Sequence, residues 1–199
     1  MDAFEQVVAE ILWRKGYWVR TSVKVELTKQ EKRAINLPSA PRWELDVVAY
    51  KGADNSLLAV ECKSYLDSPG VKLNAFDGSN EKAATRFKLF NSPKLRDVVF
   101  NRLQLQLAGA GFCPPKPRVR LCLACGRIAS KVDRDGLRTH FAAKDWELWD
   151  EAWLQESLKE MSGGGYENQV SAVVSKLLLR GKLPNELPKS TIAKGITKN

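Results

Sequence analysis

The chain has 199 residues, a formal net charge of +9 and a pI near 9.4. This length is enough for one substantial domain with a core that needs no disulfide or metal staple. The positive charge favours a polyanionic partner such as nucleic acid, without separating DNA from RNA. No segment approaches the roughly 20 apolar residues that span a bilayer, so we expect no membrane partner.

The cysteines and histidine restrict the possible chemistry further. Four cysteines lie in or beside apolar segments, as reduced buried thiols do: Cys62, Cys113, Cys122 and Cys125. Cys122 and Cys125 have the spacing of a zinc-binding pair. A structural zinc would also need Cys113 and the only histidine, His140, to converge on them, which we disfavour. No Walker-type phosphate loop is present. Because the cysteines have the pattern of reduced thiols, we expect a cytoplasmic protein in a reducing compartment. The expected first element, an amphipathic helix rather than a signal peptide, agrees with this location.

The first expected element is a helix over Phe4–Lys15, because its apolar residues recur at helical spacing. Gly16 is expected to end this helix. Glu5 shares a helix edge with part of the apolar stripe, so its carboxylate should lie beside the buried side. A first strand is expected over Tyr17–Leu27.

Two further apolar stretches predict a β-hairpin. They cover Trp43–Tyr50 and Leu57–Lys63, and the intervening residues 51–56 have the Gly, Asp, Asn and Ser composition of a tight turn. Since side chains alternate along a strand, residues two apart share a face. The hairpin therefore sets the direction of each charged residue that lies within it.

Three charged residues interrupt these apolar strands. Asp46 lies in the first, and Glu61 and Lys63 lie on one face of the second. Charges in such positions are costly to bury without partners, and a cation between the two carboxylates would remove that cost. Hard divalent cations bind through one or two carboxylates, waters and phosphate oxygens. A surface hairpin with a solvated ladder of salt bridges is the alternative interpretation.

Asp46 and the Glu61-Cys62-Lys63 triplet resemble the signature of the PD-(D/E)xK nuclease superfamily, an acid on one core strand and an acid-x-Lys on the next. The proline that precedes the aspartate in this family is replaced by Leu45. The resemblance covers roughly residues 3–160. It implies an α/β, restriction-endonuclease-like core with a mixed central sheet of about five strands flanked by helices.

The resemblance also implies roles for individual residues. Asp46, Glu61 and the backbone carbonyl of Cys62 would bind Mg²⁺, for which Mn²⁺ can substitute, and Lys63 would activate or position the attacking water. Many family members carry a further glutamate on the first helix, which makes Glu5 the candidate for an assisting catalytic group. An ordinary first-turn acid, favoured by the helix dipole, is the alternative for Glu5.

Residues 64–70 form a turn-rich segment after the second hairpin strand, and in this fold that rim faces the nucleic acid. Two helices are expected next, separated at Ser92, which can cap the second, and Pro93, which can occupy its first position. The first would carry basic residues at 82, 86 and 88. The weak candidates for substrate contacts are Ser64, Tyr65, Lys72, Arg86, Arg102 and Gln106. For the helical ones, a solvated face is the alternative.

The remaining elements are a strand over Val119–Ala124, a helix over Asp133–Lys144, a short strand over Trp146–Trp149 and a helix capped by Asp150. This ending resembles the Mrr-like branch of the superfamily. A continuous helix through the tryptophans is the alternative, and in either case they are expected in the core.

Composition divides the chain into three parts. Residues 1–161 form the nuclease-like domain, 162–181 a Gly-rich joint followed by an amphipathic helix, and 182–199 a basic, mobile tail. One helix cannot bury its own apolar stripe, so we expect it to dock on the core, with a homodimer as the alternative.

The predicted function is a Mg²⁺-dependent nuclease, a phosphodiester hydrolase for which a DNA endonuclease is favoured over an RNA-directed enzyme. The alternative is a catalytically silent, nuclease-fold nucleic-acid-binding or accessory module that acts with a partner protein. A basic scaffold in which the hairpin charges are accidental is a third interpretation.

Overall fold

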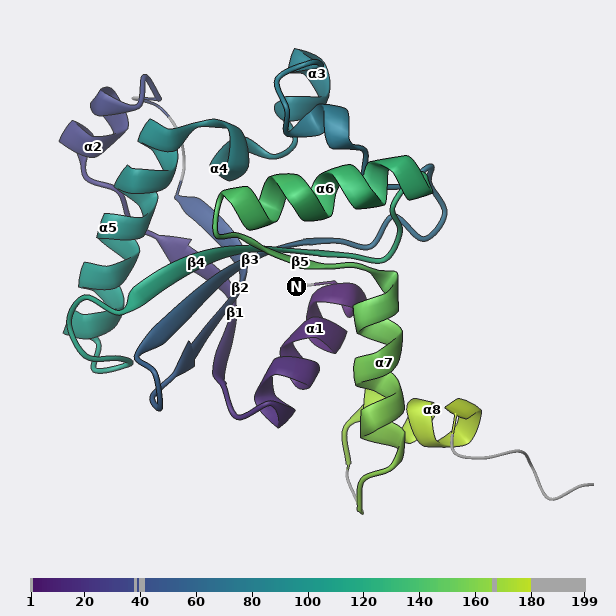
Figure 1. The fold of residues 1–199 in the computed structure, drawn as a ribbon. Coiled ribbons are helices and arrows are strands. Elements are labelled where there is room, and N and C mark those ends of the chain that lie inside the picture. Colours follow the sequence, from purple (N-terminus) through teal and green to yellow (C-terminus); the bar gives the residue numbers. More distant parts are fainter. Residues whose placement is uncertain (1, 38, 40–41, 166–167, 180–199) are drawn as a thin grey trace, which may run out of the picture. The chain divides into compact units, whose positions relative to one another are not determined.

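The computed structural model describes residues 2–37, 39, 42–165 and 168–179 (Figure 1). The predicted tail at 182–199 and the predicted end of the last helix at Gly181 lie outside these residues. The chain forms two compact units, Met1–Ser157 and Leu158–Asn199. The division falls within α7 (Glu151–Ser162), slightly before the expected boundary after residue 161.

The first unit is built on a mixed five-stranded sheet with the order β1-β2-β3-β4-β5. Its strands are β1 (Trp18–Val25), β2 (Trp43–Lys51), β3 (Ser56–Lys63), β4 (Arg118–Cys125) and β5 (Glu147–Trp149). The first three strands are antiparallel neighbours, and β3, β4 and β5 run parallel. The expected α/β class with a mixed central sheet is therefore confirmed.

Helices cover both faces of this sheet (Figure 1). One face carries α1 (Ala3–Arg14), and the other carries α5 (Pro93–Gly109) and α6 (Lys131–Ala143). The alternation of side chains in β3 explains this arrangement. Leu57 and Ala59 belong to the hydrophobic cluster under α5 and α6, whereas Leu58 and Val60 are buried but lie outside that cluster. The shorter helical elements are α2 (Lys29–Ala34), η1 (Leu73–Ala75), α3 (Glu81–Ala84) and α4 (Lys88–Asn91).

Several predicted helix ends are confirmed by their hydrogen bonds. Gly16 follows the C-cap residue of α1, has a left-handed φ of 84°, and donates its N–H to the Trp13 carbonyl. The Ser92 hydroxyl accepts from the backbone N–H of Leu95, which caps α5 as expected. The Asp150 carboxylate accepts from the N–H of Trp153 and so starts α7. A continuous helix through the tryptophans is therefore wrong, because β5 ends immediately before this cap.

The expected single basic helix before Ser92 is also wrong. The structure has two short helices, α3 and α4, with Arg86 in the turn between them. Phe87 is the reason, since it adopts a non-helical conformation (φ −129°, ψ 53°) and is buried. Its ring packs on Phe76, with 4.6 Å between centroids, and on Phe90. Burial of this aromatic group stabilises the break in the helix.

The four cysteines are buried and free, as expected. Trp149 is also buried in the core, and its ring stacks on that of Trp153 at 4.7 Å. No helix in the described ranges is long and apolar enough to cross a membrane. In the second unit, the described part of α8 (Val170–Leu179) has the predicted helical form and exposes Val170, Leu177 and Leu178. Whether this helix docks or pairs with a second chain stays a prediction.

Candidate functional site

The candidate site begins where the β2–β3 ladder stops. Val47 and Val60 are the last paired residues, and Asp46 and Glu61 follow them at this end of the hairpin. The backbone N–H of Cys62 donates to Asp46 Oδ2 at 2.7 Å. The carboxylate thus replaces the strand carbonyl that an antiparallel ladder would supply. This contact holds Asp46 beside the Glu61-Cys62-Lys63 segment.

Glu61 and Lys63 form an ion pair across one face of β3. Lys63 Nζ donates to Glu61 Oε1 at 2.5 Å, and the side chains are 24% and 21% exposed, respectively. The prediction that these two residues point the same way is confirmed. Because both groups are largely withdrawn from water, each depends on the other for compensation of its charge.

Burial raises the pKa of both carboxyl groups in this site. For Asp46, burial outweighs the stabilising Cys62 N–H and the nearby Lys63. For Glu61, burial outweighs the attraction of Lys63, and the neighbouring Asp46 and Glu5 carboxylates raise the pKa further. Two crowded, partly buried carboxylates with raised pKa values form an environment in which bound positive charge is stabilising.

Lys63 has the opposite balance. Burial lowers its pKa, but the charge and hydrogen bond of Glu61, together with smaller contributions from Asp46 and Tyr65, outweigh burial, and the net pKa is raised. Lys63 therefore remains a cation at neutral pH. A permanent cation can stabilise developing negative charge or orient a water molecule, but it cannot serve as a proton acceptor.

Glu5 caps the first helix and also lies near the other carboxyl groups, while its assisting catalytic role stays a prediction. Its carboxylate accepts from the N–H of Asp2 while its own N–H donates to Asp2, a reciprocal capping box that starts α1. Burial and the nearby Asp46 carboxylate also raise the pKa of Glu5. The helix start thus places a third carboxyl group in electrostatic contact with Asp46.

The oxygen donors of Asp46 and Glu61 are of the type that hard cations take. Across the described residues, no three His, Cys, Asp or Glu side chains are grouped closely enough to hold a metal ion. Mg²⁺ commonly takes only one or two carboxylates and completes its shell with water and substrate phosphate. No hydrogen bond within the described part of the chain occupies Asp46 Oδ1 or Glu61 Oε2. If the protein holds such an ion, these two oxygens and the Cys62 carbonyl are the groups that would bind it.

The loop that follows Lys63 is held tightly against the loop after β4. The N–H of Gly126 donates to the Lys63 carbonyl at 3.0 Å, and a Cβ on Gly126 would lie 2.2 Å from Ser64 O. Only glycine permits this approach. Three of the predicted substrate residues, Tyr65, Lys72 and Arg86, line one hollow beside this loop, whereas Ser64 is not among its described lining residues.

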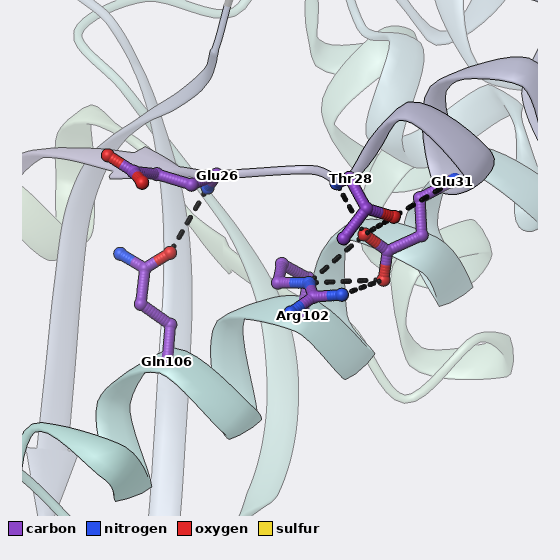
Figure 2. A network of polar contacts seen from close by, with 5 residues as sticks. All are labelled: Glu26, Thr28, Glu31, Arg102 and Gln106. Carbon is purple, nitrogen blue, oxygen red and sulfur yellow. Dashed lines mark hydrogen bonds and ion pairs between the residues drawn. The ribbon is translucent and has the colours of Figure 1, made fainter.

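Arg102 and Gln106, also predicted substrate contacts, are occupied by partners within the protein (Figure 2). Arg102 Nε and Nη2 donate to both carboxylate oxygens of Glu31 at 2.8–3.1 Å. Gln106 accepts from the N–H of Glu26 and donates to the Lys24 carbonyl. These contacts attach the end of β1 and α2 to α5, and a substrate contact for either residue stays a prediction.

The α2 part of this network was absent from the sequence predictions. Its signal was present nonetheless, because Thr28 and Glu31 form a capping box in which each side chain bonds the other residue's backbone N–H. Burial raises the pKa of Glu31, but the hydrogen bonds from Arg102 and Thr28 together outweigh burial, and the net pKa is lowered. This carboxylate therefore stays ionised and keeps its arginine partner.

Comparisons with known proteins supply no relative, since no family model, curated protein or solved structure matches this chain.

Proposed function

We propose that this protein is a metal-dependent nuclease that hydrolyses phosphodiester bonds, with DNA as the first substrate to test. A restriction-endonuclease-like arrangement of the mixed sheet is part of this proposal. The observation that carries it is the meeting of Asp46, Glu61 and Lys63 at one end of the β2–β3 hairpin. Burial keeps the pKa of both carboxyl groups raised, which supports a cation as their partner.

Each residue has a distinct part in the proposed reaction. Asp46 and Glu61, with the Cys62 carbonyl, would hold Mg²⁺ or Mn²⁺. A bound divalent ion polarises the phosphate and lowers the pKa of a coordinated water. Glu61 has two oxygens, so it can contact the ion through Oε2 while Oε1 stays with Lys63. Lys63 then lies next to the reacting phosphate and stabilises the charge that develops on its oxygens.

Glu5 is a positioning residue in this scheme. The Asp46 carboxylate raises the pKa of Glu5, and the Glu5 carboxylate raises the pKa of Glu61, so Glu5 adds to the field that attracts a cation. A Glu5→Gln variant is informative because glutamine also completes a capping box. It removes the charge and retains the helix cap, so a weaker response to Mg²⁺ would separate the two roles.

The testing experiment is nicking of supercoiled circular DNA in the presence of Mg²⁺ or Mn²⁺. Wild type is compared with Asp46→Asn, which keeps an acceptor for the Cys62 N–H, and with Lys63→Met. The matched control is Asp135→Asn, which neutralises an exposed acid on α6. We expect nicked or linear products from wild type and the control only. Thermal melting of each variant verifies that it is folded.

Two results would contradict this proposal in different ways. Full cleavage by Lys63→Met would remove the assigned mechanism. Absence of cleavage by wild type, with DNA still bound, would favour the catalytically silent binding module. The paired state of Glu61 with Lys63 is the observation that keeps this second function under consideration.

A further inference from the structure

A basic hollow lies beside the candidate site. It has a volume of about 470 Å³ and is formed by the segment that follows β3, by η1 and by the α3–α4 region. The lining residues that matter here are Tyr65, Lys72, Asn80, Lys82, Arg86 and Phe87. Its size lies within the range of about 300–1,000 Å³ that is typical of small-molecule sites. It can hold a group of nucleotide size but not a duplex.

The charge of the hollow is uniformly positive. Lys72, Lys82 and Arg86 are all exposed, and none forms an ion pair with another described residue. The described lining contains no Asp or Glu, and Asp77 and Glu81, although near in sequence, do not contribute to it. Several other arginines of the protein are neutralised by carboxylates, as Arg102 is by Glu31 (Figure 2). The hollow thus has free cations for phosphate groups.

The remaining lining residues are of types that can contact a nucleotide base and its sugar. Tyr65 is half-buried and packs against the core, and it is the partly exposed aromatic residue among the described lining residues, whereas Phe87 also borders the hollow but is buried against Phe76 and Phe90. Asn74, Asn80 and Thr85 supply polar groups. Aromatic surfaces that stack bases, combined with cations that follow the backbone, are typical of sites for single-stranded nucleic acid.

The hollow lies at the carboxyl ends of the parallel strands. Val71 pairs with Ile128 in an isolated parallel bridge, which ties the floor of the hollow to the loop after β4. A Cβ on Gly70 would lie 2.9 Å from the carbonyl oxygen of Arg127, so the two loops are in close contact. Open α/β sheets bind ligands at this end. Tyr65 is also only two residues from Lys63, so the hollow adjoins the candidate site.

We propose that this hollow binds one unpaired nucleotide of the substrate, adjacent to the phosphate at Asp46, Glu61 and Lys63. The inference rests on the proposed nuclease function and extends it to a substrate class, DNA with a single-stranded or extruded nucleotide. Arg86 and Lys72 contact the flanking phosphates, and Tyr65 stacks on the base. A fully paired duplex offers no free base for this hollow.

The test measures binding in EDTA, so that cleavage does not enter. A labelled single-stranded oligonucleotide and the corresponding blunt duplex are titrated by fluorescence anisotropy over a range of salt concentrations. Arg86→Ala and Lys72→Ala should each weaken single-strand binding about five- to tenfold. Each should also reduce the salt slope by about 0.7, the value for one lost phosphate contact on a single strand. Duplex binding should change less.

Lys144→Ala is the matched control. This exposed lysine precedes β5 and therefore lies at the amino-terminal end of the parallel strands, opposite the hollow. Its removal should leave the difference between single-strand and duplex binding unchanged. Tyr65→Leu should weaken single-strand binding at least fivefold, and Tyr65→Phe should retain it, because only the ring is needed for stacking.

Three outcomes would overturn the proposal. One is an unchanged single-strand affinity and salt slope in the Arg86 and Lys72 variants. Another is an equal loss for single strand and duplex. The third is a nucleoside monophosphate that binds as tightly as the strand, which would mark a site for free nucleotides. Since binding is measured without metal, failure of the nuclease proposal would leave these results interpretable.

Discussion

The ion pair between Glu61 and Lys63 offers the sharpest test of the candidate site. Its atoms are 2.5 Å apart, and each side chain is less than a quarter exposed. At an effective dielectric constant of about 20, two charges at this distance attract by roughly 7 kcal/mol. Desolvation costs several kcal/mol for each ion and offsets most of that gain. We therefore expect a net coupling of about 1–3 kcal/mol, between values for exposed and fully buried pairs.

The single variants should be unequal. Lys63→Met leaves the Glu61 carboxylate inside the site without its cation, so it should destabilise the protein more than the double variant does. Glu61→Gln leaves Lys63, whose long side chain can extend its ammonium group toward water. This variant should therefore cost less than Lys63→Met. The order follows from the different reach of the two side chains.

The assay is urea unfolding of wild type, Glu61→Gln, Lys63→Met and the double variant, from which the coupling free energy is obtained. The control cycle uses Arg118 and Asp145, whose side chains are 68% and 61% exposed in their ion pair. That pair should couple by less than about 1 kcal/mol. A coupling for Glu61 and Lys63 no larger than that of the control would refute the geometry described for the site.

Burial raises the pKa of Asp46 and Glu61, so the folded state binds these protons more tightly than the unfolded state. The unfolding free energy of the metal-free protein should therefore fall as pH rises from about 4 through the raised values. An Asp46→Asn/Glu61→Gln variant should lose this dependence in urea titrations, and retention would contradict the assignment. Gly126→Ala should destabilise the protein by about 2 kcal/mol or more, because the added Cβ would lie 2.2 Å from a backbone carbonyl oxygen. The control is Gly52→Ala, whose Cβ has its nearest contact at 3.9 Å, and it should cost under about 0.5 kcal/mol in the same assay. Arg102→Ala should lower the unfolding free energy by about 1–2 kcal/mol, because the contact with Glu31 on α2 is lost. The salt slope of single-strand binding should stay unchanged. A reduced slope would show that this arginine contacts phosphate.

Much of the local structure followed from the sequence. The alternation of the hairpin predicted that Glu61 and Lys63 share a face, and their ion pair shows that they do. Caps at Ser92 and Asp150 were predicted from residue type, since a short polar side chain satisfies a free N–H a few residues away. These features depend on groups that are close in the chain, so periodicity and propensity are sufficient to find them.

Other features depended on packing between distant segments. The break at Phe87 results from its contact with Phe76, and a sequence pattern of basic residues could not show which aromatic ring would be buried. The hydrogen bonds of Arg102 to Glu31, 71 residues away, were likewise absent from the sequence predictions. Such contacts form only when loop closure brings distant segments together, so no local sequence pattern predicts them.

By itself the sequence determined the α/β class, the hairpin and the presence of two acids and a lysine in neighbouring strands. Only the tertiary structure decided that the Asp46 carboxylate takes the Cys62 N–H, and that Lys72 and Arg86 border one hollow. The physical reason is that strand register and side-chain alternation are local, whereas burial, electrostatic coupling and cavities arise only when separate elements pack together.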